Sequence, residues 1–324
     1  EGNPGYPLSN GGSTTFQQSS ILDLYDPDRL SAVLLSTKKK NLNEFKDWMI
    51  QKRKDIKKVN GQGLRLLIET QLSPTFYRLL DQLKRKYPEA KVHQYAPVNM
   101  DNQLKGLSDL TNQYVLPKYK LKKANVIVSF NDDFLSLNPF QLEYAQDFSA
   151  RRDVDLGLAK LNRLYMFENR FSVTGSKSDH RYPVKQADSL PILYKLLSIV
   201  SKRVGFDLTQ IISMEMPAYN LQDVDEKTLD IIATDLLKNR SKSLVTVGSH
   251  LDPIYHQCAF LINSILGNNF KTVSYIEMPY SQYQFNRQSS QESVKELVQD
   301  IDSGEVDTII PRFQIMQLWH DPIT

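Results

Sequence analysis

Apolar residues along this chain occur in two alternating patterns, namely short continuous runs and stripes spaced three and four residues apart. The run Leu64–Glu69 follows a glycine turn and is typical of a buried strand in a parallel sheet. Ser73 and Pro74 then supply an N-cap and a first helical residue. The apolar residues of the next segment share one helical face: Phe76, Leu79, Leu80, Leu83 and Tyr87. Because Pro88 ends that pattern, the region predicts a strand followed by an amphipathic helix.

The same alternation continues to the end of the chain. Further strands are predicted at Lys91–Tyr95, Ala124–Phe130, Arg163–Glu168, Leu244–Val247, Thr272–Ile276 and Val306–Ile310. Helices are predicted at Phe140–Asp153, Ser189–Val204, Lys227–Lys238, Pro253–Leu266 and Glu292–Ile301. The alternation predicts an α/β fold in which parallel sheets are covered by helices on both faces, in about two lobes. In this scheme Leu244–Val247 and Thr272–Ile276 belong to one strand–helix–strand motif.

The N-terminal part of the chain has a different character. Residues 1–36 are rich in Gly, Pro, Ser and Asn and predict an extended segment that ends in a helical turn near Ser20–Tyr25. An amphipathic helix is predicted at Leu42–Ile56, inside the charged stretch Lys38–Lys58, where nine residues are Lys or Arg. Interspersed acidic residues favour a solvated helix face over a nucleic-acid footprint. We therefore expect three segments, namely 1–58, an α/β domain at 59–240, and a second, truncated α/β segment at 241–324.

Composition narrows the class of protein. The chain has 324 residues, 40% of them hydrophobic, and a mean hydropathy of -0.42, which is typical of a soluble globular protein large enough for two or three domains. Its apolar runs are all shorter than the roughly 18–20 residues that a membrane-spanning helix needs. The net charge of +3 is too close to zero to indicate nucleic-acid binding.

The single cysteine excludes several kinds of site. One thiol cannot form an intrachain disulfide, a Cys-rich zinc site or an iron–sulfur cluster held by four thiolates. Cys258 and His256 lie two residues apart on a predicted helix, so they face different directions and we expect a packed, inert thiol. His93, on a short strand, is expected to be a hydrogen-bonded core residue. The sequence also lacks the glycine-rich dinucleotide and phosphate loops and the nucleophile elbow of serine hydrolases.

Two candidate sites follow predicted strands. Asp132 and Asp133 come directly after Ala124–Phe130, where ligands of open α/β sheets bind, so they could contact a ribose or a metal. The alternative is that this pair caps the next turn. The loop Thr174–Arg181 contains hydroxyl groups, a glycine and two cations and could hold phosphate.

The second of these candidates also has an alternative interpretation. Lys177 and Arg181, the two cations of the loop, could instead form ion pairs across it with Glu168 or Asp179. In that case the loop's charges would be used within the chain.

The first 29 residues resemble a known N-terminal signature. They begin E-G-N-P and reach L-Y-D-P-D-R, as in the molybdopterin oxidoreductase family, where the intervening motif is G-x-x-C-x-x-G. In catalytic members that cysteine is the last ligand of an iron–sulfur cluster. Counted back from Tyr25, Thr14 stands at the position of the cysteine and Gln17 at that of the second glycine. The resemblance therefore implies the family's architecture without its cluster ligand.

Later segments resemble the same family in the same order. Asn125–Asp133 is similar to the strand that ends beside the pterin, and Leu164–Arg170 to a V-V-D-P-R-type strand. Lys177–Val184 is similar to the A-D-x-x-L-P-x segment that follows it. In catalytic relatives the region that matches Thr174–Arg181 lines a guanine dinucleotide pocket. By this resemblance Val98 stands where the molybdenum ligand belongs, and valine cannot coordinate a metal. The vestigial pocket implied by the resemblance contains these residues: Thr14, Val98, Asp132, Glu168, Lys177 and Arg181.

The details are most similar to the molybdopterin-like half of the iron–sulfur subunit of alternative complex III, a bacterial quinol:electron acceptor oxidoreductase. The matching segments are Phe16–Tyr25, His93–Asn99 and Asp179–Pro183. This resemblance implies a catalytically inert assembly subunit that binds no cofactor or metal. It also implies partners that carry iron–sulfur clusters and c-type haems, quinol-oxidising membrane subunits, and a place on the periplasmic face of the cytoplasmic membrane, with membrane contact only through partners. Two alternatives stay open, namely an active molybdopterin-dependent oxidoreductase and a nucleotide-binding α/β module that uses Thr174–Arg181.

Overall fold

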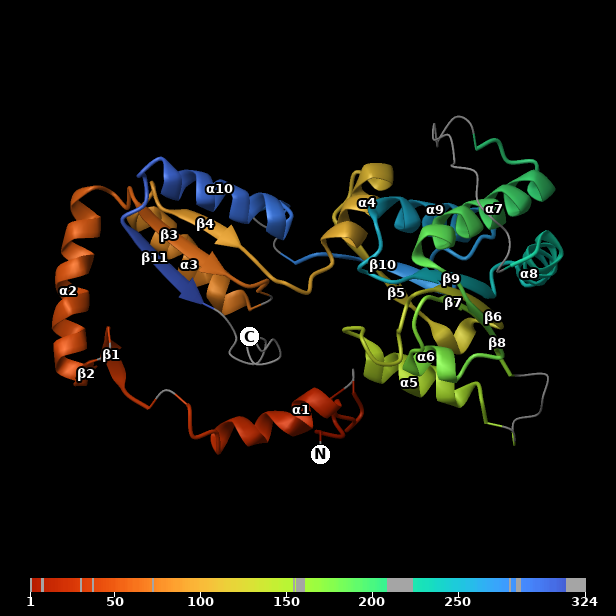
Figure 1. Cartoon of the computed structure of the whole chain (residues 1–324), viewed down its shortest axis with the longest axis horizontal. Coiled ribbons are helices and arrows are strands. Elements are labelled where there is room, and N and C mark those ends of the chain that lie inside the picture. The colour runs from red at the N-terminus through yellow and green to blue at the C-terminus, as the bar shows by residue number, and fades with distance from the viewer. Residues whose placement is uncertain are drawn as a thin grey trace. The chain divides into compact units, whose positions relative to one another are not determined.

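The chain forms two compact units in the computed structural model (Figure 1). The structure describes residues 2–6, 9–29, 31–36, 38–71, 73–153, 155, 161–208, 224–279, 281–283 and 287–312. The larger unit combines Glu1–Ser13 with Met100–Met278, and the smaller unit combines Thr14–Asn99 with Pro279–Thr324. Both units are therefore discontinuous in sequence, whereas the predicted segments 1–58, 59–240 and 241–324 are consecutive.

A four-stranded parallel sheet forms the centre of the larger unit. It contains β6 (Val126–Phe130), β7 (Arg163–Glu168), β8 (His180–Pro183) and β9 (Ser243–Val247), in the order β8-β7-β6-β9. Every residue of β6 and of β9 is buried. This burial explains why both strands appear in the sequence as nearly continuous apolar runs.

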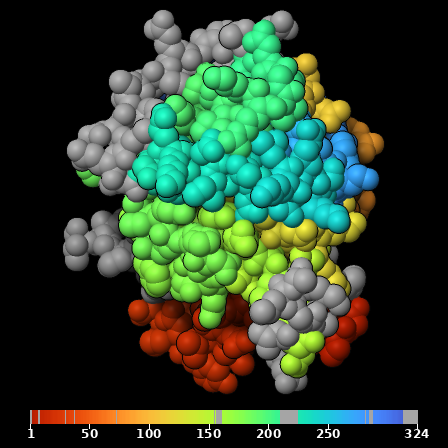
Figure 2. Space-filling view, turned by 90° about the vertical axis from the view of Figure 1, so that its right-hand side faces the viewer, coloured from red at the N-terminus to blue at the C-terminus, as the bar shows by residue number. Residues whose placement is uncertain are grey.

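Other elements cover both faces of this sheet. Val126, Val128 and Phe130 of β6 pack in one cluster with α7 (Gln186–Val204), α8 (Glu226–Lys238) and α9 (Pro253–Ile265). Ile127 packs in the second cluster with α5 (Gln141–Ala150) and β5 (Val115–Tyr119). Figure 2 shows α7 and α8 side by side on one surface of this unit. The predicted α/β fold with parallel sheets between helices is confirmed.

The predicted strand–helix–strand motif at 244–276 is wrong in one respect. β10 (Val273–Glu277) does not join β9 in the parallel sheet but pairs with β5 in an antiparallel ribbon. In the parallel sheet β9 pairs with β6, whereas β10 has its partner in β5, a strand that the sequence pattern did not predict. Pro117 lies within β5, where a two-stranded ribbon leaves an outer edge that needs no amide hydrogen.

The smaller unit has its own parallel sheet, in the order β11-β3-β4. Its strands are β3 (Leu64–Ile68), β4 (Lys91–Gln94) and β11 (Thr308–Arg312). Helix α3 (Pro74–Lys86) packs Tyr77 and Leu80 against this sheet. The predicted apolar face is therefore right for Leu80 but wrong for Leu79, which is 51% exposed, and it missed Tyr77. Helix α10 (Ser290–Asp302) is held to it by Asp300, which accepts from Arg65 Nε at 2.7 Å and from Lys91 Nζ at 2.9 Å.

The N-terminal region of the smaller unit consists of short elements and one long helix. These are α1 (Thr15–Ser19), a 3₁₀ helix (Ser20–Leu24), the antiparallel pair β1 (Val33–Leu35) and β2 (Lys38–Lys40), and α2 (Leu42–Lys58). The predicted helical turn and the predicted amphipathic helix are confirmed within one or two residues. No residue of α2 is buried. Among the described residues, no helix has both the length and the apolar composition needed to cross a membrane.

Helix α4 (Asp101–Thr111), which the sequence pattern did not predict, packs against α9 in the larger unit. The contact depends on Gly106. A Cβ atom added there would lie 2.4 Å from the Pro253 carbonyl oxygen and 2.9 Å from His256 Cβ. The two backbones can approach this closely only because position 106 has no side chain.

We predict that Gly106→Ala lowers the free energy of unfolding by about 1–3 kcal/mol, because the strain of the added methyl group outweighs the gain in helix propensity. The matched control is Lys105→Ala on the same helix. Lys105 is exposed, and its one ion pair among the described residues is with Asp109, at 3.5 Å, so we expect a change of no more than about 0.5 kcal/mol. Urea denaturation followed by circular dichroism measures both, and equal values for the two variants would contradict the packing role of Gly106.

Candidate functional site

A buried carboxylate organises the polar loop at the end of β7. Glu168, the last residue of β7, is 1% exposed and accepts hydrogen bonds from Arg181 Nε and from Ser172 Oγ. Gly175, in the short helix α6 (Val173–Ser176), makes room for it, because a Cβ there would lie 2.1 Å from Glu168 Oε1. The Arg181 guanidinium also lies over the Phe171 ring, 4.8 Å from its centroid. The glycine and the arginine that suggested a phosphate site therefore surround a carboxylate of the chain itself, together with the hydroxyl of Ser172, which precedes the predicted loop.

The remaining charges of this loop are arranged differently. Asp179 accepts two hydrogen bonds from Arg152, at 2.8 and 2.6 Å, and one from the Leu164 amide at 2.7 Å. Lys177 is exposed and forms no ion pair within the described part of the chain. The alternative in which Arg181 pairs with Glu168 is confirmed, whereas Lys177 has no such role.

The two acidic residues after β6 lie in different surroundings. Asp133 accepts hydrogen bonds from the Thr174 amide at 2.8 Å and from its hydroxyl at 2.7 Å, and so ties the end of β6 to α6. Asp132 is only 5% exposed, and its Oδ2 has no hydrogen-bond partner among the described residues. Burial raises the pKa of the Asp132 carboxyl to about 7, which the Thr246 hydroxyl opposes and the Asp133 charge reinforces. Asp132 therefore lies within the core, where a ribose or a metal cannot reach it from solvent.

The crevice between β6 and β9 is the place where the order of strands in this sheet reverses, and such a crevice commonly holds ligands. Here the segments that follow the two strands approach each other closely. A Cβ added at Gly248 would lie 2.3 Å from the Asn131 carbonyl oxygen. The Asn131 side chain accepts from the Asn169 amide at 3.0 Å and donates to Gln186 Oε1 at 3.2 Å. The side chains at this edge are therefore linked to one another.

Thr14 and Gln17, the two substituted positions of the N-terminal signature, interact directly. The Gln17 amide donates to Thr14 Oγ1 at 3.1 Å, and the Thr14 amide donates to Gln17 Oε1 at 2.8 Å. This is a capping box at the N-terminus of α1. The residues fit a helix cap, and they do not fit an iron–sulfur cluster, since neither supplies a thiolate. Glu1, Pro7 and Leu8 of the same signature lie outside the described residues.

The predicted metal-ligand position is held by a side chain of the wrong kind. Val98 is 79% exposed on the loop after β4 and has no atom that can coordinate a metal. That loop is fixed by its own hydrogen bonds, in which Asn99 Nδ2 donates to the Ala96 carbonyl at 2.9 Å. Nearby His93 is 1% exposed and its Nδ1 is 3.1 Å from the Ser293 carbonyl oxygen, so its predicted place in the core is confirmed. Burial lowers the pKa of His93.

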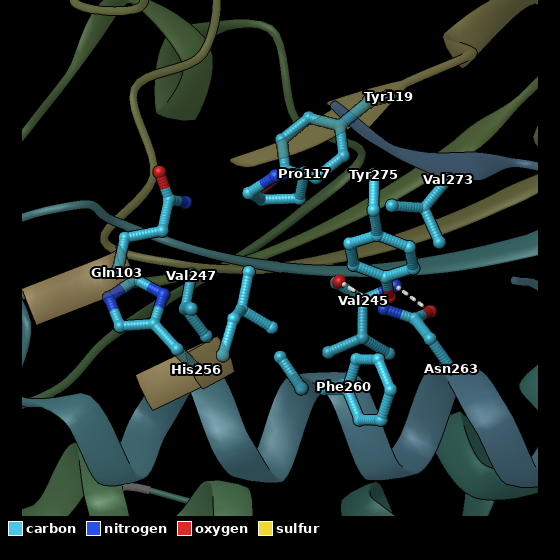
Figure 3. Close-up of a pocket in the computed structure, with 12 residues that line it drawn as sticks. Gln103, Pro117, Tyr119, Val245, Val247, His256, Phe260, Asn263, Val273 and Tyr275 are labelled. Carbon is cyan, nitrogen blue, oxygen red and sulfur yellow. Dashed lines mark hydrogen bonds between the residues drawn. The ribbon is translucent and has the colours of Figure 1, made fainter. Parts of the chain in front are cut away.

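A small cavity of about 20 Å³, partly open to solvent, lies in the larger unit between α4, α9, β9 and the β5–β10 ribbon (Figure 3). Two of its polar side chains, Asn263 and Tyr275, are used for structure. Asn263 binds the Val245 amide at 3.0 Å and the Val245 carbonyl at 2.8 Å, and the Tyr275 hydroxyl donates to Asn269 at 2.9 Å. Burial lowers the pKa of His256 to about 4, so this side chain is neutral near pH 7.

No ready nucleophile or metal site accompanies this cavity in the described residues. Cys258 is fully buried, as predicted, and burial raises the pKa of its thiol to about 12. The described ranges contain no group of three or more His, Cys, Asp or Glu side chains placed to hold a metal ion.

The structure brings together only some of the predicted site residues. Glu168, Arg181 and the loop of Lys177 form one cluster, and Asp132 lies beside it through Asp133 and Thr174. Thr14 and Val98 belong to the smaller unit. Tyr119 and Thr246, which face Asp132, were missed because they lie far from it in sequence. The capping box could have been found, because T-x-x-Q before a helix is its sequence signature.

Comparisons with known proteins give a likeness of fold. No family model and no curated protein matches the sequence. Acetylene hydratase from Pelobacter acetylenicus is similar with a TM-score of 0.54 and 12% identity, over 83% of this chain and 39% of that chain. A chain of the formyltransferase/hydrolase complex from Methylorubrum extorquens, solved with methylofuran, gives a TM-score of 0.45 and 12% identity, over 83% and 74% of the two chains. Because that score is below 0.5, we infer nothing from it.

The likeness to acetylene hydratase concerns the fold alone. It supports the molybdopterin-oxidoreductase-like fold that the N-terminal block predicts. It gives no support to the more specific resemblance to alternative complex III. The chain spans about two fifths of the length of that enzyme, 39%. The activity and the partners of a whole protein of this type are therefore matters for proposal.

We predict that Arg181→Ala lowers the free energy of unfolding by about 2–4 kcal/mol, because it leaves the buried Glu168 carboxylate without its cation. Lys177→Ala is the matched control, since it removes a cation from the same loop without breaking an ion pair, and we expect a change within about 0.5 kcal/mol. Chemical denaturation compares the two. Similar small losses for both variants would show that Arg181 is not needed for the loop's structure.

The raised pKa of Asp132 leads to a second prediction, which concerns how the free energy of unfolding depends on pH. Because it is raised to about 7, the folded chain keeps a proton that the unfolded chain releases near pH 4. The stability contributed by this proton is complete below about pH 4 and is lost as the pH rises through about 7. Asp132→Asn is neutral at every pH. Relative to the native chain, we expect its free energy of unfolding to gain about 2–3 kcal/mol more at pH 8 than at pH 5; a gain independent of pH would contradict the assignment.

Proposed function

We propose that this chain is a non-catalytic assembly subunit of a membrane-bound quinol:electron acceptor oxidoreductase of the alternative complex III type, in a bacterial respiratory or photosynthetic chain. It would present surfaces to an iron–sulfur domain or subunit, to multihaem cytochromes c and to quinol-oxidising membrane subunits. Its place would be on the periplasmic face of the cytoplasmic membrane. The chain itself would bind no cofactor and carry no electron.

The capping box of Thr14 and Gln17 is the observation that carries this proposal. In the resembling family these two positions hold the cluster cysteine and a glycine. Here the replacements form two reciprocal hydrogen bonds that begin a helix. Such paired replacements support a sequence that has adapted to the lack of a cluster, because a single random substitution would leave the second position without a matching partner.

Three further observations agree with an inert role. Val98 at the metal-ligand position supplies no donor atom. Arg181, a cation of the segment that resembles the dinucleotide-pocket segment, is bound to Glu168. The likeness in fold to acetylene hydratase supports a molybdopterin-oxidoreductase-like frame. These observations support a frame in which Arg181 and the pair Thr14–Gln17 serve folding and Val98 offers no ligand.

Purification of the native complex through an affinity tag on this chain tests the proposal. We expect c-type haem absorbance and quinol oxidation in the purified material. Asp132→Asn and Lys177→Ala, which change candidate pocket residues, should leave the quinol oxidation rate within about twofold, because neither residue takes part in electron transfer. If the complex assembles normally but either variant loses about 100-fold or more in rate, as loss of a general base would cause, the chain is catalytic and the proposal is wrong.

A further inference from the structure

Helix α2 has an apolar stripe that the described part of the chain does not cover. Leu42, Phe45 and Met49 follow one another at helical spacing and are 59%, 39% and 41% exposed. Trp48, at the edge of this stripe, is 49% exposed and its ring stacks against Phe45 with centroids 6.3 Å apart. A solvated surface helix would have polar side chains at these positions, so the stripe needs an apolar environment.

Among the residues that the structure describes, only the C-terminal end of the stripe has such an environment. Ile56, the next stripe position along the helix, packs against the cluster of Leu64, Tyr87 and Ala90 beside the sheet of the smaller unit. The Gly61 amide donates to the Ile56 carbonyl at 2.9 Å and fixes the turn that follows the helix. The helix is therefore attached at one end, and its exposed apolar side chains lie toward the other.

The charges of α2 are sorted around the stripe. At about 100° of rotation per residue, Lys52 falls on one side of the stripe, and Arg53, Lys46 and Lys57 fall on the other. None of these four cations forms an ion pair within the described residues. The three acidic residues of the helix all lie more than about 100° from the centre of the stripe: Glu44, Asp47 and Asp55. Four of the six cations of the helix thus border the apolar surface, and the acidic side chains lie away from it.

The charge of this segment also differs from that of the rest of the molecule. Lys38–Lys58 contains nine basic and three acidic residues, a net charge of +6 in 21 positions. The other residues together contain 31 basic and 34 acidic side chains, a net charge of -3. Glu44 and Asp55 are further neutralised by ion pairs with Lys40 at 2.9 Å and with Lys58 at 3.0 Å. An anionic surface would therefore attract this segment and repel the remainder of the chain.

We propose that α2 lies on an anionic lipid bilayer, with Leu42, Phe45 and Met49 in the headgroup–acyl boundary and the bordering cations on lipid phosphates. Helices that lie in this boundary combine an apolar face that includes Trp or Phe with Lys and Arg at its borders. Trp48 takes the position at the edge of the stripe that amphipathic aromatic rings prefer. Nucleic acid would bind the cations through its phosphates but would leave the apolar stripe exposed to water. The inference goes beyond the proposed function, because it gives the chain a direct contact with the membrane in addition to its partners.

Vesicle binding by the full chain tests this directly. Trp319→Phe leaves Trp48 as the only tryptophan of the two in the sequence. With phosphatidylglycerol-containing vesicles we expect its emission to shift to the blue and the protein to sediment with the vesicles, and we expect salt to weaken both effects. Pure phosphatidylcholine vesicles should bind much less. Failure to bind anionic vesicles at low salt would overturn the inference and favour an apolar groove on a protein partner.

Matched variants separate an oriented helix from general attraction between opposite charges. Lys52→Gln/Arg53→Gln removes two bordering cations and should weaken partitioning roughly 30-fold, at about fivefold for each basic residue near the surface. Lys54→Gln/Lys58→Gln removes the same charge from the polar face and should weaken it less than about threefold. Phe45→Ser/Met49→Ser should abolish the shift in Trp48 emission. Equal losses in the two charge variants would overturn the proposed orientation. Because these side chains are exposed, circular dichroism should show the folded chain in every case.

Discussion

The larger unit depends on a constraint set by its parallel sheet, whose central strand β6 is buried on both faces. Polar groups at the carboxyl edge of such a sheet cannot all reach water, so each unpaired one costs free energy. In this chain, other side chains of the protein pair with these polar groups. Glu168 is bound by Arg181 and Ser172, and Asp133 by Thr174. This internal pairing decides what the edge of the sheet can do, because a ligand would have to compete with bonds that already exist.

The same principle applies at a second place in the chain. The signature positions Thr14 and Gln17 bond to each other at the beginning of a helix, and the loop that contains Val98 is held by Asn99. Thr14 and Gln17, which stand at the signature positions by resemblance, therefore stabilise local structure, whereas Val98 is exposed beside the bond that Asn99 makes. Asp132 is the exception, since it is buried without a partner for Oδ2 among the described residues and its pKa is raised to about 7. Burying this carboxyl without a hydrogen-bond partner for Oδ2 lowers the stability of the fold.

Much of the fold could be predicted from the sequence, because local patterns record burial. The runs at β3, β6 and β9 and the stripe of α3 all indicated their elements. The pairings of distant segments could not be predicted in this way. β11 pairs with β3, and β10 with β5, across more than a hundred residues, and no periodicity encodes these contacts. The division of the chain into two discontinuous units follows from such pairings.

The residues of the candidate site could be predicted from the sequence, but most of the contacts between them could not. The loop Thr174–Arg181 and its alternative ion pair could both be stated from residue types, but only coordinates place Gly175 against Glu168. The environment of Asp132 was hidden because Tyr119 and Thr246 come from other strands. The basic helix α2 was predicted correctly as an amphipathic helix, and its charges were expected to form a solvated face, but the sequence did not indicate that its apolar stripe is exposed. Its exposure became evident only when no described element was found to cover it.

The central claim is that a redox enzyme's frame has exchanged its metal ligands for side chains that serve folding. The most direct measurement is the molybdenum and tungsten content of the purified full chain, determined by mass spectrometry together with extractable pterin fluorescence. The account predicts neither metal nor pterin in stoichiometric amount. A sample that contains one of these metals and its pterin in proportion to protein would contradict it.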